Sequence, residues 1–588
     1  MRVDKMINLE INGIPVSVPA GTTILEAARK TGIEIPTLCF MKEKNEIGAC
    51  RICVVEANEG RGYRIVTSCV YPVSEGMKVL TNSAKVQKAR KTTLELMLST
   101  HNKECLSCIR STHCEFQKLC QEYGTDENAF SGFRPIYELD TTTAHLVRDN
   151  NKCILCRRCV AACREQFVSI LGANDRGIDT NIGNAFGMSL VNTPCISCGQ
   201  CTVVCPTGAL TEKDDTPLVW AALADPTKKV IVQTAPAIRA TLGEWFGMEP
   251  GTNVEGKMAA ALRRLGFYRV FDTDAGADLT IVEEANELVE RIQNGGVLPM
   301  ITSCSPGWVK FCETYYGDLI PHLSTCKSPH QMLGAVIKSY WAQKEGIDPK
   351  DIVTVSVMPC VAKKFECKRD DQNAAGYPDV DIAITTRELG RMIERAGINF
   401  KALPNEEFDS PLSEDTGAAV IFGATGGVME AALRTANDWL TGKDNTDIEF
   451  HGVRGTAGLK ESEANFGGLK VKVAVASGAA AAKVVMDKLA AGNPDGWTFI
   501  EIMGCPGGCV NGGGQPYQPQ WVRDTVDLKA VRAKALYDQD RGMTLRKSHE
   551  SPFVKALYSE WYTEGFGKGE AHHALHTSYV KREKFVQE

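Results

Sequence analysis

The sequence has no continuous apolar run of about 18 residues, the length that a membrane-spanning helix requires. Its start lacks an apolar signal core and a twin-arginine lead, so we expect a cytoplasmic protein without a membrane segment. The net charge is -6 and no Lys/Arg-rich stripe interleaved with aromatics occurs, which argues against nucleic acid as the main partner. No GxGxxG unit with its acidic residue is present, so any NAD(P) chemistry requires a flavin-containing partner subunit.

The chain is long and rich in cysteine. Its 588 residues, 43% of them apolar, suffice for about four domains with sizeable cores. In a reducing compartment, 23 cysteines at such close spacing are more often metal ligands than disulfides. Four of them have no partner at cluster spacing and are expected to be buried free thiols: Cys120, Cys312, Cys326 and Cys367.

Residues 1–83 have the pattern of a small β-grasp domain. Alternating apolar residues on both sides of the turn Asn12-Gly13 predict a hairpin, and residues 23–30 predict a helix. A CxxC between two outlying cysteines follows and indicates a [2Fe-2S] site. A zinc knot is the alternative, because zinc also accepts four thiolates. The predicted ligands are Cys39, Cys50, Cys53 and Cys69.

Residues 84–143 predict a second, smaller cluster domain. A helix over residues 84–98 leads to a histidine and three cysteines whose spacing can complete a four-coordinate [4Fe-4S] site. The histidine lies four residues before a CxxC, which favours a ligand role, and His113 is the weaker candidate. The predicted ligands are His101, Cys105, Cys108 and Cys114.

Residues 144–217 carry two C-x2-C-x2-C-x3-C runs, the pattern of a bacterial ferredoxin with two [4Fe-4S] clusters. In that fold the fourth cysteine of each run crosses over to the other cluster. One predicted ligand set is therefore Cys153, Cys156, Cys159 and Cys205, and the other is Cys163, Cys195, Cys198 and Cys201.

Residues 218–588 alternate apolar strand runs with helical stretches, which predicts an α/β domain with largely parallel sheets. The expected strands are residues 229–233, 353–358, 418–422 and 471–476. The whole chain is thus expected to be multidomain, α+β in its N-terminal part and α/β in its C-terminal part. Sites in such a domain lie at strand ends.

Three cysteine-bearing loops fall at or near predicted strand ends. Four thiolates converging from three loops indicate one more iron-sulfur centre, and the glycines around them allow close backbone approach to a bulky inorganic group. Lys363 adds a positively charged donor suited to an anionic ligand. The cysteines are Cys304, Cys360, Cys505 and Cys509.

These loops, together with the upstream cluster order, closely resemble the [FeFe]-hydrogenases. The segments at residues 302–308, 358–366 and 501–516 match that family's TSCCPxW, MPCxxKxxE and ExMxCxxGCxxGGGxP signatures with one exception. The resemblance implies an H-cluster, in which a [4Fe-4S] cubane shares a cysteine sulfur with a two-iron unit carrying CO, cyanide and azadithiolate. With one [2Fe-2S] and three [4Fe-4S] clusters upstream, it implies five metal centres.

The resemblance also implies residue roles. Cys360 and Cys505 would bind the cubane, Cys509 would supply the shared sulfur, and Lys363 would hydrogen-bond a cyanide. Three apolar residues would pack around the two-iron unit: Met358, Met503 and Pro236.

The exception lies in the first loop, where the family has two adjacent cysteines and this chain has Cys304 followed by Ser305. In gap-free register Cys304 takes the family's proton-relay position and Ser305 its cubane-ligand position. A hydroxyl is a poorer ligand than a thiol for an iron-sulfur cluster, which favours Cys304 as the cubane ligand with Ser305 or water as the relay. The opposite assignment stays open.

A proton route is expected on a helix over residues 278–291. There Glu284, Glu287 and Arg291 share one face, and with Ser324 they match the relay positions of the family. The alternative is that these charged residues simply form a solvent-exposed helix face without a role in proton transfer. His330 stands where the family commonly has glutamine, and the histidines of the closing segment, residues 572–576, are expected to be structural.

The sequence thus predicts an enzyme that interconverts protons, electrons and H2, with either ferredoxin or a flavin/NAD(P)-binding subunit as electron partner. We favour the catalytic subunit of an NAD(P)-linked complex. A single-chain ferredoxin-linked hydrogenase and an H2-sensing protein with low turnover are the alternatives. An iron-sulfur subunit of an NADH-quinone oxidoreductase is disfavoured, because such a subunit should lack the three C-terminal cysteine loops.

Overall fold

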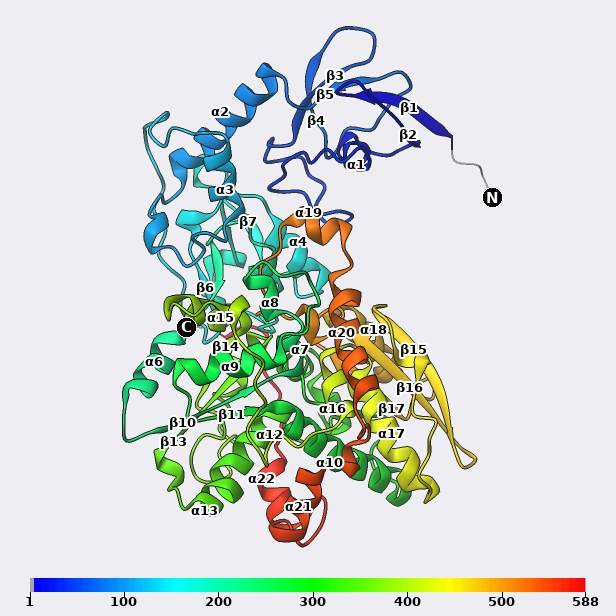
Figure 1. Cartoon of the computed structure of the whole chain (residues 1–588). Coiled ribbons are helices and arrows are strands. Elements are labelled where there is room, and N and C mark those ends of the chain that lie inside the picture. The colour runs from blue at the N-terminus through cyan, green and yellow to red at the C-terminus, as the bar shows by residue number, and fades with distance from the viewer. Residues whose placement is uncertain (1–4, 587–588) are drawn as a thin grey trace.

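The computed structural model describes residues 5–586, so the extreme ends, including the first four residues of the predicted β-grasp domain, lie outside it. The chain runs from a small N-terminal domain through a narrower neck to a large C-terminal domain (Figure 1). No helix among residues 5–586 has the length and apolar character needed to cross a membrane.

The N-terminal domain is a five-stranded sheet covered by one helix, in the strand order β2-β1-β5-β3-β4. Its helix α1 (Ile24–Lys30) begins with a capping box, in which Thr23 and Glu26 bond each other's backbone N–H groups. Alternate residues of the first strand point into the core, which is the half-buried pattern that the sequence predicts. The strands are β1 (Met6–Ile11), β2 (Ile14–Pro19), β3 (Val54–Asn58), β4 (Arg64–Thr67) and β5 (Lys78–Leu80).

The neck is formed by short helices and two small antiparallel ribbons that hold the cysteine runs. The ribbons pair β6 with β9 and β7 with β8. Its elements are α2 (Ala84–Thr100), α3 (Glu115–Glu122), β6 (Leu146–Arg148), α4 (Arg158–Glu165), β7 (Gly172–Asn174), β8 (Asn181–Gly183), α5 (Gln200–Val204) and β9 (Leu210–Glu212).

The C-terminal domain contains two four-stranded sheets. The first is wholly parallel in the order β11-β10-β13-β14, and the second has the order β12-β17-β16-β15 with only β15 antiparallel. The predicted parallel α/β character is therefore confirmed. The strands are β10 (Lys229–Thr234), β11 (Arg269–Asp272), β12 (Met300–Ile301), β13 (Ile352–Met358), β14 (Ile382–Thr385), β15 (Leu459–Phe466), β16 (Leu469–Ser477) and β17 (Phe499–Met503).

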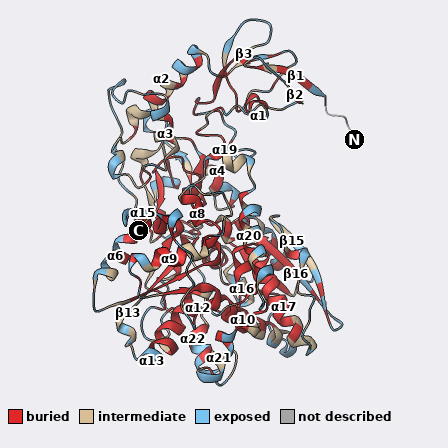
Figure 2. Cartoon of the chain, in the orientation of Figure 1, coloured by how far each residue is buried: buried red, intermediate tan, exposed pale blue. Residues whose placement is uncertain are grey.

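Helices surround these sheets, and the interior is buried throughout (Figure 2). The 22-residue helix α10 (Thr273–Asn294) is buried along most of its length and packs against α12 and α17. The principal helices are α6 (Thr216–Ala224), α9 (Glu255–Leu265), α11 (Pro306–Tyr315), α12 (Pro329–Val336), α15 (Thr386–Arg395), α17 (Gly427–Thr441), α18 (Ala479–Ala490), α20 (Leu528–Gly542), α21 (Pro552–Glu560) and α22 (Gly569–Leu575).

One strand prediction is wrong. Residues 418–422 form the end of helix α16 (Gly417–Val420) and a 3-10 turn, η10 (Ile421–Gly423). A short apolar run fits a buried helix as well as a buried strand, and here every residue of the run is buried. A Cβ on Gly417 would lie 2.3 Å from the Asp540 carboxylate of α20, so close packing against that helix determines the local structure.

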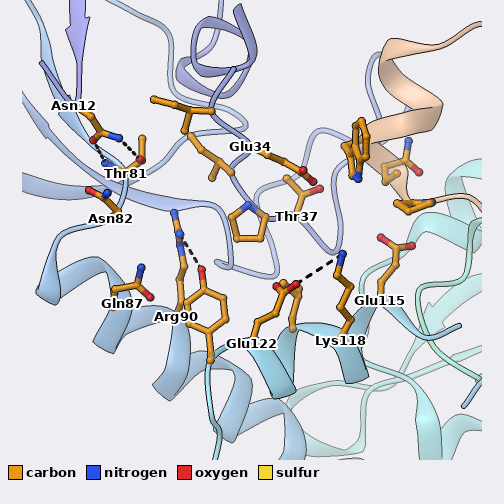
Figure 3. A pocket seen from close by; sticks show the side chains of 18 residues that line it. Asn12, Glu34, Thr37, Thr81, Asn82, Gln87, Arg90, Glu115, Lys118 and Glu122 are labelled. Atoms are coloured by element: carbon orange, nitrogen blue, oxygen red, sulfur yellow. Dashed lines mark hydrogen bonds and ion pairs between the residues drawn. The ribbon is translucent and has the colours of Figure 1, made fainter. Parts of the chain in front are cut away.

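The N-terminal domain rests on the neck and on helix α19 (Gln520–Thr525) of the C-terminal domain (Figure 1). Arg29 of α1 forms an ion pair with Asp524 of α19 at 3.0 Å. A cleft of about 490 Å³ lies beside this junction, with Arg90 and the Lys118–Glu122 ion pair on its neck side (Figure 3). The cleft wall therefore combines side chains from all three parts of the molecule.

Candidate active site

The four cysteines of the N-terminal domain are all buried and close together. Cys39 and Cys50 are linked by a backbone N–H to Sγ contact of 3.5 Å. The neighbouring Cys69 thiol outweighs burial and lowers the pKa of Cys53. Four mutually interacting thiols in a dry site are a donor set that fits a [2Fe-2S] cluster.

A cavity of about 390 Å³ is lined by His101, Cys105, Cys108 and Cys114 together. The Nδ1 atom of His101 is buried without a hydrogen-bond partner among the described residues. Burial, reinforced by Lys152, lowers the pKa of this imidazole to about 4, so it is neutral and has a lone pair for a metal. His113 stacks on Trp245 with ring centroids 3.9 Å apart, which gives it a packing role.

The two cysteine runs of the neck line two separate small cavities. Each cavity takes three cysteines from one run and the fourth from the other, in the crossed arrangement that the sequence predicts. One is lined by Cys153, Cys156, Cys159 and Cys205, and the other by Cys163, Cys195, Cys198 and Cys201.

The C-terminal cysteines follow three parallel strands. Cys304 lies three residues after β12, while Cys360 and Cys505 lie two residues after β13 and β17. Cys360 contributes to the electrostatic field at both Cys505 and Cys509, so these three thiols lie near one another. Burial and the neighbouring Cys360 raise the pKa of Cys509 to about 12, a cost that iron coordination would remove.

Glycines bring the backbone tightly around these thiols. A Cβ on Gly512 would lie 2.1 Å from the carbonyl oxygen of Pro359, and one on Gly508 would lie 2.6 Å from the amide nitrogen of Thr425. Gly508 also has a φ of +90°, a conformation that few side-chain-bearing residues adopt. The loops can therefore form a close cradle for a compact inorganic group.

Cys304 and Ser305 face different neighbours. Burial, followed by the charges of Glu284 and Cys509, raises the pKa of the Cys304 thiol well above the usual value. The Ser305 Oγ accepts a hydrogen bond of 3.0 Å from the backbone N–H of Gly504, next to Cys505. Cys304 is thus on the carboxylate side of the site and Ser305 on the side of the ligand loop.

Lys363 is buried between two acceptors beside the thiols. Its Nζ donates to Glu366 at 2.8 Å and to the Cys304 carbonyl at 3.2 Å. Although burial favours the neutral acid, Lys363 and His330 lower the pKa of Glu366 to about 2. His330 contacts the same carboxylate at 2.5 Å and Ser356 at 3.0 Å. Lys363 is therefore fixed by Glu366 at the edge of the site.

The three apolar residues expected around the two-iron unit are all buried. Met358 ends β13 and Met503 ends β17, each directly before a cysteine loop. Pro236 is the first residue of α7 (Pro236–Arg239), just beyond the end of β10. All three thus lie where the chain leaves a parallel strand, near the same edge as the thiols.

Three of the four residues predicted for the proton route are joined by hydrogen bonds, and the fourth, Glu284, is buried apart from them. Arg291 donates to Glu287 at 2.5 Å, and Ser324 donates to the same carboxylate at 2.8 Å. Glu284 is 1% exposed, and neither of its carboxylate oxygens has a hydrogen-bond partner among residues 5–586. Burial, together with Glu287, raises its pKa to about 8, so this carboxyl is mostly protonated at neutral pH.

Sequence reasoning missed the residues that join the neck to this site. Gln166 donates to the Gly504 carbonyl at 2.8 Å, and Gln200 donates to the Asn511 carbonyl at 2.9 Å. Arg387 is fully buried and bonds both Glu212 of the neck and the Gly513 carbonyl at 2.9 Å. None of these contacts could have been predicted, because a single sequence does not show which residues far apart along the chain meet. This holds even for the buried Arg387–Glu212 ion pair.

Family comparisons divide the chain in the same order. A 2Fe-2S iron-sulfur cluster binding domain matches residues 4–84, an NADH-ubiquinone oxidoreductase-G iron-sulfur binding region matches 90–129, and a 4Fe-4S dicluster domain matches 152–209. The iron only hydrogenase large subunit, C-terminal domain, matches residues 228–513. The iron hydrogenase small subunit family matches residues 526–582, which include α20, α21 and α22.

Whole-chain relatives agree. The chain is 46% identical to the NADP-reducing hydrogenase subunit HndD of Solidesulfovibrio fructosivorans, over 98% of this chain and 100% of the relative. It is 43% identical to iron hydrogenase 1 of Clostridium pasteurianum over the same shares. A solved structure of an apo [FeFe]-hydrogenase HydA1 variant from Chlamydomonas reinhardtii matches with a TM-score of 0.56 at 41% identity, covering 62% of this chain and 98% of that one.

Proposed function

This chain belongs to the iron hydrogenase family, and from that premise we propose how its residues divide the reaction of H2 with protons and electrons. The chain is a hydrogenase catalytic subunit whose N-terminal iron-sulfur domains relay electrons. Our proposal assigns the cofactors, the proton route and the partner. The observation that carries it is the buried Glu284, whose oxygens lack hydrogen-bond partners among residues 5–586 and whose charge acts on the Cys304 thiol.

We propose that electrons cross one [2Fe-2S] and three [4Fe-4S] clusters before they reach the active site. The four donor sets described above support this count, because each set meets at one buried site. The Cys505 thiol lies 3.9 Å from the carbonyl oxygen of Cys198. The cluster at Cys198 is therefore the one adjoining the catalytic centre, and Gln166, Gln200 and Arg387 hold that junction rigid.

An H-cluster fits the C-terminal site, where its cubane would be held by Cys360, Cys505 and Cys509. When bound, its two-iron unit supplies the open iron position and the basic amine at which protons and electrons combine. Lys363 offers a fixed cationic donor to an anionic diatomic ligand. The buried methionines Met358 and Met503 exclude water from the pocket.

We assign the proton-relay role to Cys304 and the fourth cubane position to Ser305. Support comes from their neighbours: Cys304 is next to the protonated Glu284, and Ser305 is anchored on the backbone beside Cys505. Protons then move from Glu287 through Ser324 to Glu284 and on to Cys304, while Arg291, which stays protonated, orients the Glu287 carboxylate. The carboxyl, hydroxyl and thiol groups of this route can each accept and pass on a proton.

Iron analysis tests this assignment. In purified protein with all clusters assembled, Cys304→Ser should keep a complete catalytic cubane by Mössbauer spectroscopy while H2 evolution is lost. Ser305→Cys should also keep the cubane but alter its spectrum, because sulfur replaces oxygen on one iron. Loss of the cubane in Cys304→Ser would instead make Cys304 the ligand and leave Ser305 as the relay.

We propose that the chain works with a flavin-containing NAD(P)-binding subunit. The 46% identity to a subunit of an NADP-reducing hydrogenase supports this partner, and a cytoplasmic location is part of the same proposal. A ferredoxin-linked single-chain role is the second candidate, supported by the 43% identity to iron hydrogenase 1. Copurification of a flavoprotein from the native cells would favour the first, and its absence the second.

A further inference from the structure

A second cluster of potential metal ligands lies beside the proton route. The carboxylate of Glu287, the thiol of Cys326 and the imidazole of His576 each place one ligand atom within 4.8 Å of the others. They come from helix α10, from the loop before α12 and from the segment after α22. The thiol is buried, while Glu287 and His576 are half-buried at the outer side of the route.

Backbone pairing holds two of the three ligands together. Cys326 and His576 face each other across an isolated antiparallel bridge, flanked by the hydrogen bonds Lys327 N–H to Leu575 O and Thr577 N–H to Thr325 O, each 2.8 Å. Residues at such a position form the close, non-hydrogen-bonded type of antiparallel pair, whose side chains share one face. The pairing therefore directs the thiol and the imidazole to the same side.

Helix α10 presents the third ligand to this pair. The Cys326 Sγ lies 3.8 Å from the Glu287 Oε2. Ligand atoms in a tetrahedral zinc site are roughly 3.5 Å apart, because the bonds to zinc are about 2.0 to 2.3 Å long. Closing the three atoms around a cation thus requires only side-chain adjustment and no movement of the helix.

The surroundings favour a divalent cation. His576 Nε2 lies 3.2 Å from the Glu283 carboxylate, the outer partner that metal-bound histidines commonly have, so Nδ1 is left as the ligand atom. Nδ1 now lies 2.8 Å from the Thr325 hydroxyl, which a metal would displace. Three acidic side chains lie around the thiol, namely Glu287, Glu284 and Glu283, and Arg291 forms an ion pair with Glu287.

We propose that Glu287, Cys326 and His576 form a site for a zinc-class divalent cation that closes the proton route. Thiolate, imidazole and carboxylate are all zinc ligands, and three protein ligands leave a fourth position for water. Binding of the cation releases the proton of the Cys326 thiol. It also occupies the Glu287 carboxylate, which otherwise accepts the hydrogen bond from Ser324. The inhibitory effect rests on the proposed route through Glu287, whereas the ligand set does not.

The test uses full-length protein with its clusters assembled and its iron content checked, titrated with Zn²⁺. Zinc-edge X-ray absorption should report one site with one sulfur neighbour and otherwise nitrogen or oxygen neighbours, and H2 evolution at saturating reductant should fall as that site fills. Cys326→Ser and His576→Gln should each weaken zinc binding by more than about tenfold, since loss of even an outer partner costs that much. Cys312→Ser, a buried thiol elsewhere, should bind zinc as the parent does.

Equal zinc affinity in the parent and in both variants, or a zinc shell without sulfur, would overturn the site. His576→Gln keeps the test decisive if Cys326→Ser fails to fold. Zinc bound with the expected shell but without loss of H2 evolution would overturn the closing of the route and the proposed role of Glu287. The zinc shell can be read even in protein without turnover, so failure of the site and failure of the proposed function are separable.

Discussion

At the scale of single residues, the account depends on a few buried groups that lack ordinary partners. Glu284, with both oxygens unpaired, and His101, with an unpaired Nδ1, stand out because buried polar atoms are nearly always hydrogen-bonded. Such exceptions occur where a proton or a metal completes the site. The sequence motifs identified both residues, but only the fold shows that they are unpaired.

Replacing Glu287 with glutamine should reduce H2 evolution by about 100-fold, because an amide cannot pass on a proton as a carboxyl does. The measurement is turnover with saturating reductant, so that electron supply does not limit the rate. Glu290→Gln, an exposed change one position before Arg291 on the same helix, is the matched control and should have no effect. Undiminished turnover in Glu287→Gln would rule out this route.

Glu284 predicts a pH-dependent stability. Its pKa rises from an ordinary 4.5 to about 8 in the folded protein. Between these two values the folded state binds a proton that the unfolded state has lost, so this group lowers the stability of the fold progressively as the pH rises from about 5 to 8. Glu284→Gln removes the penalty. The melting temperature of Glu284→Gln should therefore rise relative to that of the parent protein as the pH is raised through this window. A melting-temperature difference that does not change with pH would contradict a buried, protonated carboxyl at Glu284.

At the scale of elements, helix α10 and the strand ends determine the site. The sequence predicted the end of β13, because an apolar run stops directly before Cys360, whereas a strand at β17 was not among the predicted ones. It misread residues 418–422, because a short buried run carries no periodicity that separates helix from strand. It also offered no sign that the thiol and imidazole of Cys326 and His576 meet, since that pairing joins segments 250 positions apart.

The junction between neck and catalytic domain predicts a large effect from one arginine. Arg387→Ala should destabilise the folded protein by about 3 kcal/mol, because it leaves the buried Glu212 short of one of its two cationic partners and breaks a bond to the Gly513 loop. Chemical unfolding measures this loss. Arg395 is an exposed arginine on the same helix α15, and Arg395→Ala should change stability little. Equal destabilisation by the two substitutions would contradict the proposed role of Arg387 at the junction.

At the scale of the whole molecule, the N-terminal domain contacts the rest of the chain through the neck and the Arg29–Asp524 ion pair. Removing residues 1–83 should therefore spare H2 evolution from a small artificial electron donor while it abolishes electron exchange with the proposed NAD(P)-linked partner. Assays with both donors on the same preparation measure this difference. Equal loss with both donors would mean that the domain is needed for folding and not for electron supply.

The order of domains and the cysteine sets could be predicted from sequence because cluster ligation requires fixed local spacings. The interdomain joints and the Cys304/Ser305 register could not, since both depend on which distant groups the fold brings within hydrogen-bond distance. The crossed pairing of the two neck runs shows both effects. Its spacing is local, while its geometry appears only when the two runs fold together.

Infrared spectroscopy of the fully assembled protein tests the central claim most directly. The proposed two-iron unit, held by Cys509 and faced by Lys363, would carry CO and cyanide, whose stretching bands lie apart from protein absorption. We predict both sets of bands, with the cyanide bands shifted in Lys363→Met. Their absence from protein whose [2Fe-2S] and [4Fe-4S] clusters are complete would contradict the assignment of an H-cluster to this site.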